Sequence, residues 1–325
     1  MMLLSILAVV GGLVALAWSS DVFVDGAAAL SRRFGVSPFI VGMVVIGFGT
    51  SAPELCVSVS SGIGGYSELS LGNAYGSCIF NIAAILGCVA LVKPIAVKPV
   101  AAFAGAPILT SIALLSAFFL RGGAISRPEA FILLGLFAVL MPAYCVIDQK
   151  YSDVPPPHMS AKGEDEEEMP FGKAVMKTVG GLVVLALSSH ALVKGSVYIA
   201  TSIGVSQLVI GLTIVAIGTS LPELASAIAA ARKNESDLVL GNIVGSNIFN
   251  TLAVVGTSAS ISPADNVSTL VATRDLAFTA ALSASVFVFG LCRRKGSKQG
   301  FIGFWGGVAL LATFAVYSFL LAKGR

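Results

Sequence analysis

Long apolar stretches, separated by short polar ones, make up most of the chain. Ten of them are long enough to cross a bilayer, for which an α-helix needs about 20 residues. We expect these helices at 2–30, 36–61, 68–92, 100–120, 127–147, 172–202, 205–231, 237–260, 268–292 and 300–321. The pattern therefore predicts an all-α membrane protein with ten transmembrane helices, of which the first and sixth are long enough to be tilted.

Composition supports a membrane location. Of the 325 residues, 56% are hydrophobic and 11% are charged, whereas a soluble domain carries about 25% charged residues. No basic stripe is present, which argues against a nucleic-acid partner. The five cysteines are scattered without a Cys-x-x-Cys spacing, so we expect buried thiols and neither a disulfide framework nor a zinc site.

The sequence contains an internal duplication with a displacement of 169 residues. Gly-Phe-Gly-Thr-Ser-Ala-Pro-Glu-Leu at 47–55 corresponds to Ala-Ile-Gly-Thr-Ser-Leu-Pro-Glu-Leu at 216–224. Gly-Asn-Ala-Tyr-Gly-Ser-Cys-Ile-Phe-Asn at 72–81 corresponds to Gly-Asn-Ile-Val-Gly-Ser-Asn-Ile-Phe-Asn at 241–250. The apolar N-terminus has its own equivalent in mid-chain, so we expect a structural helix there and not a removable signal peptide.

The duplication predicts two inverted halves. Five crossings separate the copies, and because five is odd the second copy enters the membrane upside down. The halves are expected at 1–147 and 172–325, with the duplicated segments at about 36–92 and 205–260. Two inverted-topology five-helix repeats are an architecture of many secondary transporters.

Basic residues predict the orientation of the chain. Alternate loops hold 14 of the 20 Lys and Arg residues, and such loops face the cytoplasm. We therefore expect an integral multi-pass protein of the plasma (inner) membrane with both termini outside. The segment 148–171, with acidic residues at 164–168, is expected to be a solvated cytoplasmic linker, and a cation-sensing role is the alternative.

Two acidic residues lie deep within apolar stretches. Glu54 and Glu223 occupy equivalent places in the two copies, and a charge in mid-membrane is costly enough to indicate function. Inversion is expected to bring both close to one axis, where they can face each other. Pro53 and Pro222 precede them and free backbone carbonyls one turn earlier, which a bound cation can satisfy.

Neutral oxygen donors accompany these glutamates. Thr50 lies four residues and Ser51 three residues before Glu54, so all three share one face of a helix. Asn73, Ser77 and Asn81 are spaced by four, and this stripe recurs as Asn242, Ser246 and Asn250. Two carboxylates with neutral oxygens suit Ca²⁺ or Na⁺, whereas the lack of a His or Cys cluster argues against zinc or copper.

Four further ionisable residues occupy equivalent positions nearer the helix ends. Asp21 and Asp25 in the first helix correspond to His190 and Lys194 in the sixth. We interpret all four as interfacial residues, with a gating or proton-transfer role as the alternative.

At the duplicated motifs the chain resembles the cation/calcium exchanger superfamily, in its compact prokaryotic sodium/calcium antiporter branch. The motifs of that superfamily, Gly-Thr-Ser-x-Pro-Glu and Gly-Asn-x-x-Gly-Ser-Asn-Ile-x-Asn or -Asp, stand in both copies, and the resemblance covers nearly the whole chain. It implies that Glu54 and Glu223 coordinate Ca²⁺ together with the carbonyls of Thr50 and Thr219.

The resemblance also implies two flanking sodium sites. One would use Thr50, Ser51, Ser246 and the carbonyl of Gly47. The other would use Thr219, Ser220, Ser77 and the carbonyl of Ala216. Asn81 and Asn250 would line the middle of the site.

The chain departs from the pattern of the superfamily at two positions. Asn250 stands where well-studied members have Asp, which leaves the sodium dependence open. Cys78 stands where the motif has Asn, and we expect it to serve packing.

The function expected from the sequence is antiport of Ca²⁺ and Na⁺ by a monomer without a cofactor, with alternating access at a central two-glutamate site. A proton-coupled or sodium-independent divalent cation antiporter is the alternative. A passive channel and an intramembrane hydrolase using Ser51 or Ser220 are less consistent with the chain. The hydrolase lacks a matching Lys or His in both copies.

Overall fold

The computed structural model describes residues 2–65, 67–151, 169–204, 216–265, 267–292 and 299–323. Within these residues, eight helices are long and apolar enough to cross a membrane, and a bent helix pair at 38–63 makes a ninth span. The seventh apolar stretch, 205–231, lies partly outside the described residues, and the acidic run at 164–168 lies wholly outside them. The prediction of an all-α membrane protein is confirmed.

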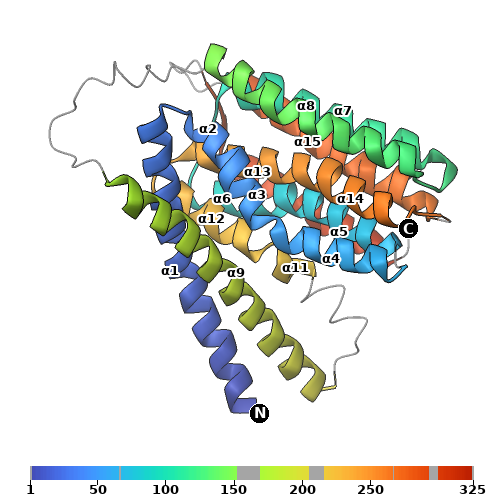
Figure 1. The fold of residues 1–325 in the computed structure, drawn as a ribbon, viewed down its shortest axis with the longest axis horizontal. Coiled ribbons are helices and arrows are strands. Elements are labelled where there is room, and N and C mark those ends of the chain that lie inside the picture. Colours follow the sequence, from blue (N-terminus) through green and yellow to red (C-terminus); the bar gives the residue numbers. More distant parts are fainter. Residues whose placement is uncertain are drawn as a thin grey trace.

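The helices of the two halves follow the expected order (Figure 1). The first half contains α1 (Met2–Phe34), α2 (Pro38–Val41), η1 (Gly42–Gly47), α3 (Phe48–Thr50), α4 (Ala52–Ile63), α5 (Ser67–Ile79), η2 (Phe80–Ile85), α6 (Leu86–Val92), β1 (Ile95–Val97), η3 (Val100–Gly105), α7 (Ala106–Phe119), η4 (Leu120–Gly122) and α8 (Arg127–Tyr151). The second half contains α9 (Phe171–Ser202), α11 (Ala216–Thr219), α12 (Leu221–Arg232), α13 (Ser236–Ile248), η6 (Phe249–Val254), α14 (Val255–Ile261), η7 (Val271–Asp275), α15 (Leu276–Leu291), β2 (Gly300–Ile302) and α16 (Phe304–Ala322).

The two longest helices, α1 and α9, form an antiparallel pair along one side of the molecule, and their far ends extend away from the other helices (Figure 1). Glycine lets them approach closely: a Cβ on Gly26 would lie 2.6 Å from the backbone nitrogen of Thr178, and one on Gly195 would lie 2.7 Å from the carbonyl oxygen of Ser5. Few residues in the most apolar part of each helix are buried. The contact between α1 and α9 is therefore more extensive than the contact between this pair and the rest of the protein.

The centre of the molecule is formed by α13 and the segments that pack on it. The span from Ser236 to Ile261 is buried throughout its most apolar part. A Cβ on Gly241 would lie 2.1 Å from the carbonyl oxygen of Phe39, and one on Gly245 would lie 2.2 Å from that of Met43. Only glycine at these positions allows α13 to press its backbone against α2 and η1, as expected for helix contacts in membranes.

Alternate connections meet at the same end of the molecule, as up-and-down topology requires. At the end that we call the basic end, β1 pairs antiparallel with β2, with Ile95 opposite Ile302, and Lys98 forms an ion pair with Asp237. At the opposite end, the connection before α8 bonds to the one after α14 through reciprocal backbone hydrogen bonds of Ile125 and Ala264, 2.8 and 3.1 Å long.

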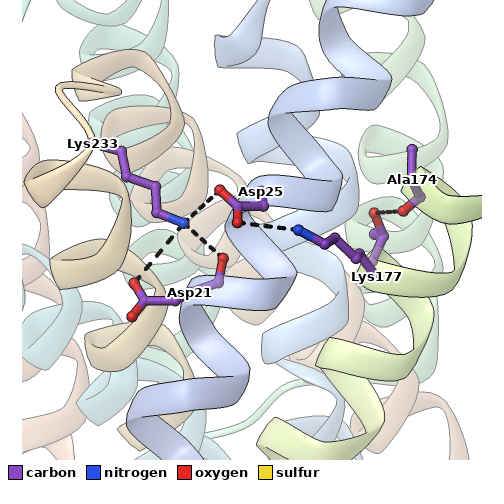
Figure 2. A network of polar contacts seen from close by, with 6 residues as sticks. Asp21, Asp25, Ala174, Lys177 and Lys233 are labelled. Atoms are coloured by element: carbon purple, nitrogen blue, oxygen red, sulfur yellow. Dashed lines mark hydrogen bonds and ion pairs between the residues drawn. The ribbon is translucent and has the colours of Figure 1, made fainter. Parts of the chain in front are cut away.

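A network of ion pairs near the basic end joins α1 to α9 and to the end of α12 (Figure 2). Lys233 donates to Asp25 Oδ1 at 2.6 Å and to the carbonyl oxygen of Asp21 at 2.8 Å. Lys177, on α9, donates to Asp25 Oδ2 at 3.4 Å. Asp25 thus binds both lysines, while the carboxylate of Asp21 reaches Lys233 only at 4.0 Å.

We expect Asp25→Asn to lower the free energy of unfolding by about 0.5–2 kcal/mol, because it weakens two partly exposed ion pairs. Thermal unfolding in detergent at low salt measures this loss, which should shrink in 1 M salt because the pairs are screened. Asp21→Asn is the matched control, and its loss should be smaller because its carboxylate makes only the long contact. Equal losses in the two variants would contradict this assignment of the network.

Candidate ion-binding site

Both copies contain a helix that breaks in mid-span at the same serine. Ser51, between α3 and α4, has φ −85° and ψ 6°, and Ser220, between α11 and α12, has φ −94° and ψ 10°. The first broken span is bent by 44°. Proline follows each serine by two residues, and because proline lacks an N–H it cannot complete the helical hydrogen bonds across the break.

Each helix that follows a break carries one of the two glutamates in its first turn. Glu54 lies in the first turn of α4, and Glu223 lies in the first turn of α12. The N-terminus of a helix carries partial positive charge from unpaired N–H groups, which stabilises a nearby carboxylate. Half-helices that start in mid-membrane therefore provide a favourable position for these two acids.

Each glutamate accepts a hydrogen bond from the breaking serine of the other copy. Ser51 Oγ donates to Glu223 Oε1 at 3.0 Å, and Ser220 Oγ donates to Glu54 Oε1 at 2.9 Å. Both carboxyl groups are fully buried, and the Oε2 atom of each has no partner among the described residues. The structure thus brings the two acids into one reciprocal cluster and leaves one oxygen of each available to a ligand.

One of the two predicted flanking sets is brought together in full around the first break. Ser246 Oγ donates to the carbonyl oxygen of Gly47 at 3.2 Å and lies 3.3 Å from Asn242 Oδ1. Thr50 Oγ1 lies 3.5 Å from the same amide oxygen and donates to the carbonyl oxygen of Ile46 at 2.9 Å. Four oxygen-bearing groups thereby meet beside Ser51.

In the second flanking set, the structure brings two of the four predicted members into contact. Ser220 Oγ lies 3.4 Å from Ser77 Oγ, so this pair lies together beside Glu54. Thr219 ends α11 and Ala216 begins it.

The two central amides lie at the start of π-helical turns. Asn81 is the second residue of η2, and Asn250 is the second residue of η6. The two π segments are exactly one repeat apart, and such turns occur frequently at functional sites. Both side chains are fully buried; Asn81 Oδ1 and both polar atoms of Asn250 have no hydrogen-bond partner among the described residues.

Asn73 and Asn242, which the sequence places among the oxygen donors, contact the backbones of the glutamates through their amide nitrogens. Asn73 Nδ2 donates to the carbonyl oxygen of Glu54 at 3.1 Å and to Ser58 Oγ at 3.0 Å. Asn242 Nδ2 lies 3.4 Å from the carbonyl oxygen of Glu223 and 3.2 Å from Ser226 Oγ. The sequence indicates these asparagines only by their place one turn before Ser77 and Ser246. Their positioning role depends on contacts with another helix, which the sequence does not show.

The donor set consists of oxygens. Among the described residues, no three His, Cys, Asp or Glu side chains gather as a metal cluster, and all five cysteines are free thiols. His190 and Lys194 lie exposed on α9, whereas the glutamates are buried. Two carboxylates among hydroxyls, amides and carbonyls match hard cations such as Ca²⁺ and Na⁺.

Comparisons with known proteins agree with this chemistry. Residues 4–143 and 173–323 match the family described as "Sodium/calcium exchanger protein". The chain is 34% identical to the inner membrane protein YrbG of Escherichia coli, over 92% of each chain. It is 28% identical to the sodium/calcium exchanger MaX1 of Methanosarcina acetivorans, over 95% of this chain and 96% of that one.

A solved structure shows the same fold. The sodium-calcium exchanger NCX_Mj, in crystals soaked with Na⁺ and Sr²⁺, superposes with a TM-score of 0.83 at 29% sequence identity, and the match covers both chains in full. MaX1 and NCX_Mj are both named as sodium/calcium exchangers, which agrees with the expectation that this protein is a transporter. With the family matched over both halves and the fold shared throughout, this chain is an integral multi-pass membrane protein that belongs to the sodium/calcium exchanger family.

Proposed function

We propose that this protein exchanges Ca²⁺ for Na⁺ across the membrane by alternating access at the central site formed around Glu54 and Glu223. The observation that carries the proposal is the reciprocal pair of buried glutamates, each with one oxygen bonded to a serine of the other copy and one oxygen without a partner among the described residues. Such oxygens, buried without hydrogen bonds, favour binding of a cation.

Charge balance supplies the coupling in this proposal. Two ionised carboxylates carry a formal charge of −2, which one Ca²⁺ neutralises. Sodium ions at the flanking sets would draw on the same two carboxylates, through the hydroxyls of Ser51 and Ser220 that contact them. Full occupancy by both kinds of ion is then unfavourable, so binding of one ion promotes release of the other.

The α1–α9 pair is the proposed moving element. The two helices are packed closely on each other, and few residues in their most apolar parts are buried, so they can slide over the other helices without opening their own contact. In this proposal, both termini face outward, the acidic linker is cytoplasmic, and a monomer performs the exchange, with the ions as cargo and no resident cofactor.

A sodium-independent or proton-coupled antiporter for divalent cations is the second candidate, and Asn250 is the observation that favours it. An amide at this position, buried and without a hydrogen-bond partner among the described residues, removes one ionisable group from the centre. With less negative charge, the site holds fewer monovalent cations at once.

The direct test is uptake of radiolabelled calcium by proteoliposomes that contain the purified protein. Vesicles loaded with Na⁺ and diluted into sodium-free calcium buffer should accumulate calcium, because outward sodium flux drives inward calcium flux. Vesicles without a sodium gradient, or with an acidic interior alone, should not. Uptake driven by the proton gradient alone would favour the second candidate, and uptake without any counter-ion would indicate a channel.

Glu54→Gln should reduce calcium uptake at least about tenfold, because it removes one of two charges that bind the divalent ion. Glu223→Gln should cause a similar loss because its environment is equivalent. Glu129→Gln is the matched control: Glu129 is a helix-capping residue whose hydrogen bonds with Ser126 are exposed, and Gln can make the same capping contacts. Wild-type uptake in Glu54→Gln would refute the central site.

Ser51→Ala and Ser220→Ala should each weaken calcium binding by about three- to tenfold, because each removes a hydrogen bond that orients a carboxylate. Calorimetry on the purified protein in detergent measures this affinity. Ser283→Ala provides the comparison, since that buried hydroxyl donates to the carbonyl oxygen of Thr279 in its own helix, at 2.7 Å. A large effect of one central serine and none of the other would contradict the pseudo-symmetric site.

A further inference from the structure

The centre of the site contains a second symmetric contact, between α5 and α13. Cys78 and Asn247 occupy equivalent positions of the two copies, and each side chain lies against the backbone carbonyl of the other. Asn247 Nδ2 donates to the carbonyl oxygen of Cys78 at 3.2 Å, and Cys78 Sγ lies 3.8 Å from the carbonyl oxygen of Asn247. A side chain at either position is thus placed beside the opposite helix.

Asn247 fixes the orientation of Asn81. A backbone carbonyl can only accept, so the nitrogen of the Asn247 amide must face Cys78 and its oxygen must face the other way. That oxygen accepts from Asn81 Nδ2 at 3.0 Å. Asn81 Oδ1 is left as a buried oxygen without a hydrogen-bond partner among the described residues, so it is available to a ligand.

The mirror-image contact is missing for Asn250. By the repeat, the residue that would orient Asn250 is at position 78, where a thiol stands in place of an amide. Cys78 Sγ lies 3.5 Å from Thr251 Oγ1, and sulfur is a weak acceptor. Both polar atoms of Asn250 are buried and without a partner among the described residues, so no hydrogen bond fixes which of them faces the centre.

We propose that Asn247 and Cys78 are positioning residues that set which donor groups the two central amides present to the cation. Asn247 holds Asn81 as an oxygen ligand. Cys78 leaves Asn250 free to turn, so its oxygen reaches the cation only when the amide rotates into place. This inference rests on the proposed central site and makes position 78 a determinant of calcium affinity.

The experiment measures equilibrium binding of radiolabelled calcium to the purified full-length protein in detergent. Cys78→Asn supplies the missing acceptor, so Asn250 should be locked with its oxygen toward the site. Calcium should then bind about three- to tenfold more tightly, since the ligand is preorganised by one added hydrogen bond. Cys88→Asn, the same exchange ten residues along the helix, should produce no such gain.

The same substitution in an Asn250→Ala background provides the decisive comparison. If Cys78 acts through Asn250, the gain must vanish when residue 250 has no amide, giving a clear interaction energy in a double-mutant cycle. An equal gain in both backgrounds would overturn the proposal. So would the absence of any gain from Cys78→Asn alone, provided that this variant unfolds at the same temperature as the wild type.

Asn247→Ala tests the other half of the contact and remains informative if Cys78→Asn fails to fold. It should weaken calcium binding about three- to tenfold, and much less in an Asn81→Ala background. Equal losses in both backgrounds would overturn the proposal. Failure of the central site itself has a different signature: Glu54→Gln would bind calcium like the wild type, whatever residue stands at 78 or 247.

Discussion

A polar group in the middle of a membrane has no water to satisfy it, and this constraint governs the whole site. Breaking two helices in mid-span exposes backbone groups, and placing a glutamate directly after each break adds a charge. The protein meets these demands across the repeat: each serine at a break bonds to the glutamate of the other half. Neither half could satisfy its own acid this way, so the two halves are obligate partners.

The surrounding helices can be understood as support for that exchange of hydrogen bonds. Glycines at 241 and 245 bring the backbone of α13 against the first broken span. Asn73 and Asn242 then hold the carbonyls of the glutamates from the neighbouring helices. These hydrogen bonds restrict the movement of the acids, which reduces the free energy lost on ordering the site.

Much of this arrangement could be predicted from the sequence, because the duplication shows which residues are equivalent and the odd number of crossings shows that they face each other. Glu54, Ser51, Glu223 and Ser220 were identified in that way. The ability of Asn247 to orient Asn81 could not be predicted, since it depends on the register between α5 and α13. For the same reason Cys78 was interpreted as a packing residue.

The ion pairs between Asp25 and the lysines illustrate a further limit of sequence patterns, because Asp25 and Lys233 are 208 residues apart and belong to different halves.

These ion pairs also break the two-fold symmetry of the molecule. The repeat aligns Asp25 with Lys194, Lys177 with Ala8 and Lys233 with Gly64, so the opposite end cannot form the same network. In a perfect inverted repeat, two conformations that exchange the roles of the halves would have equal energy. If the protein alternates between two such conformations as proposed, ion pairs confined to one end remove this equality of energy and favour one conformation even without an ion gradient.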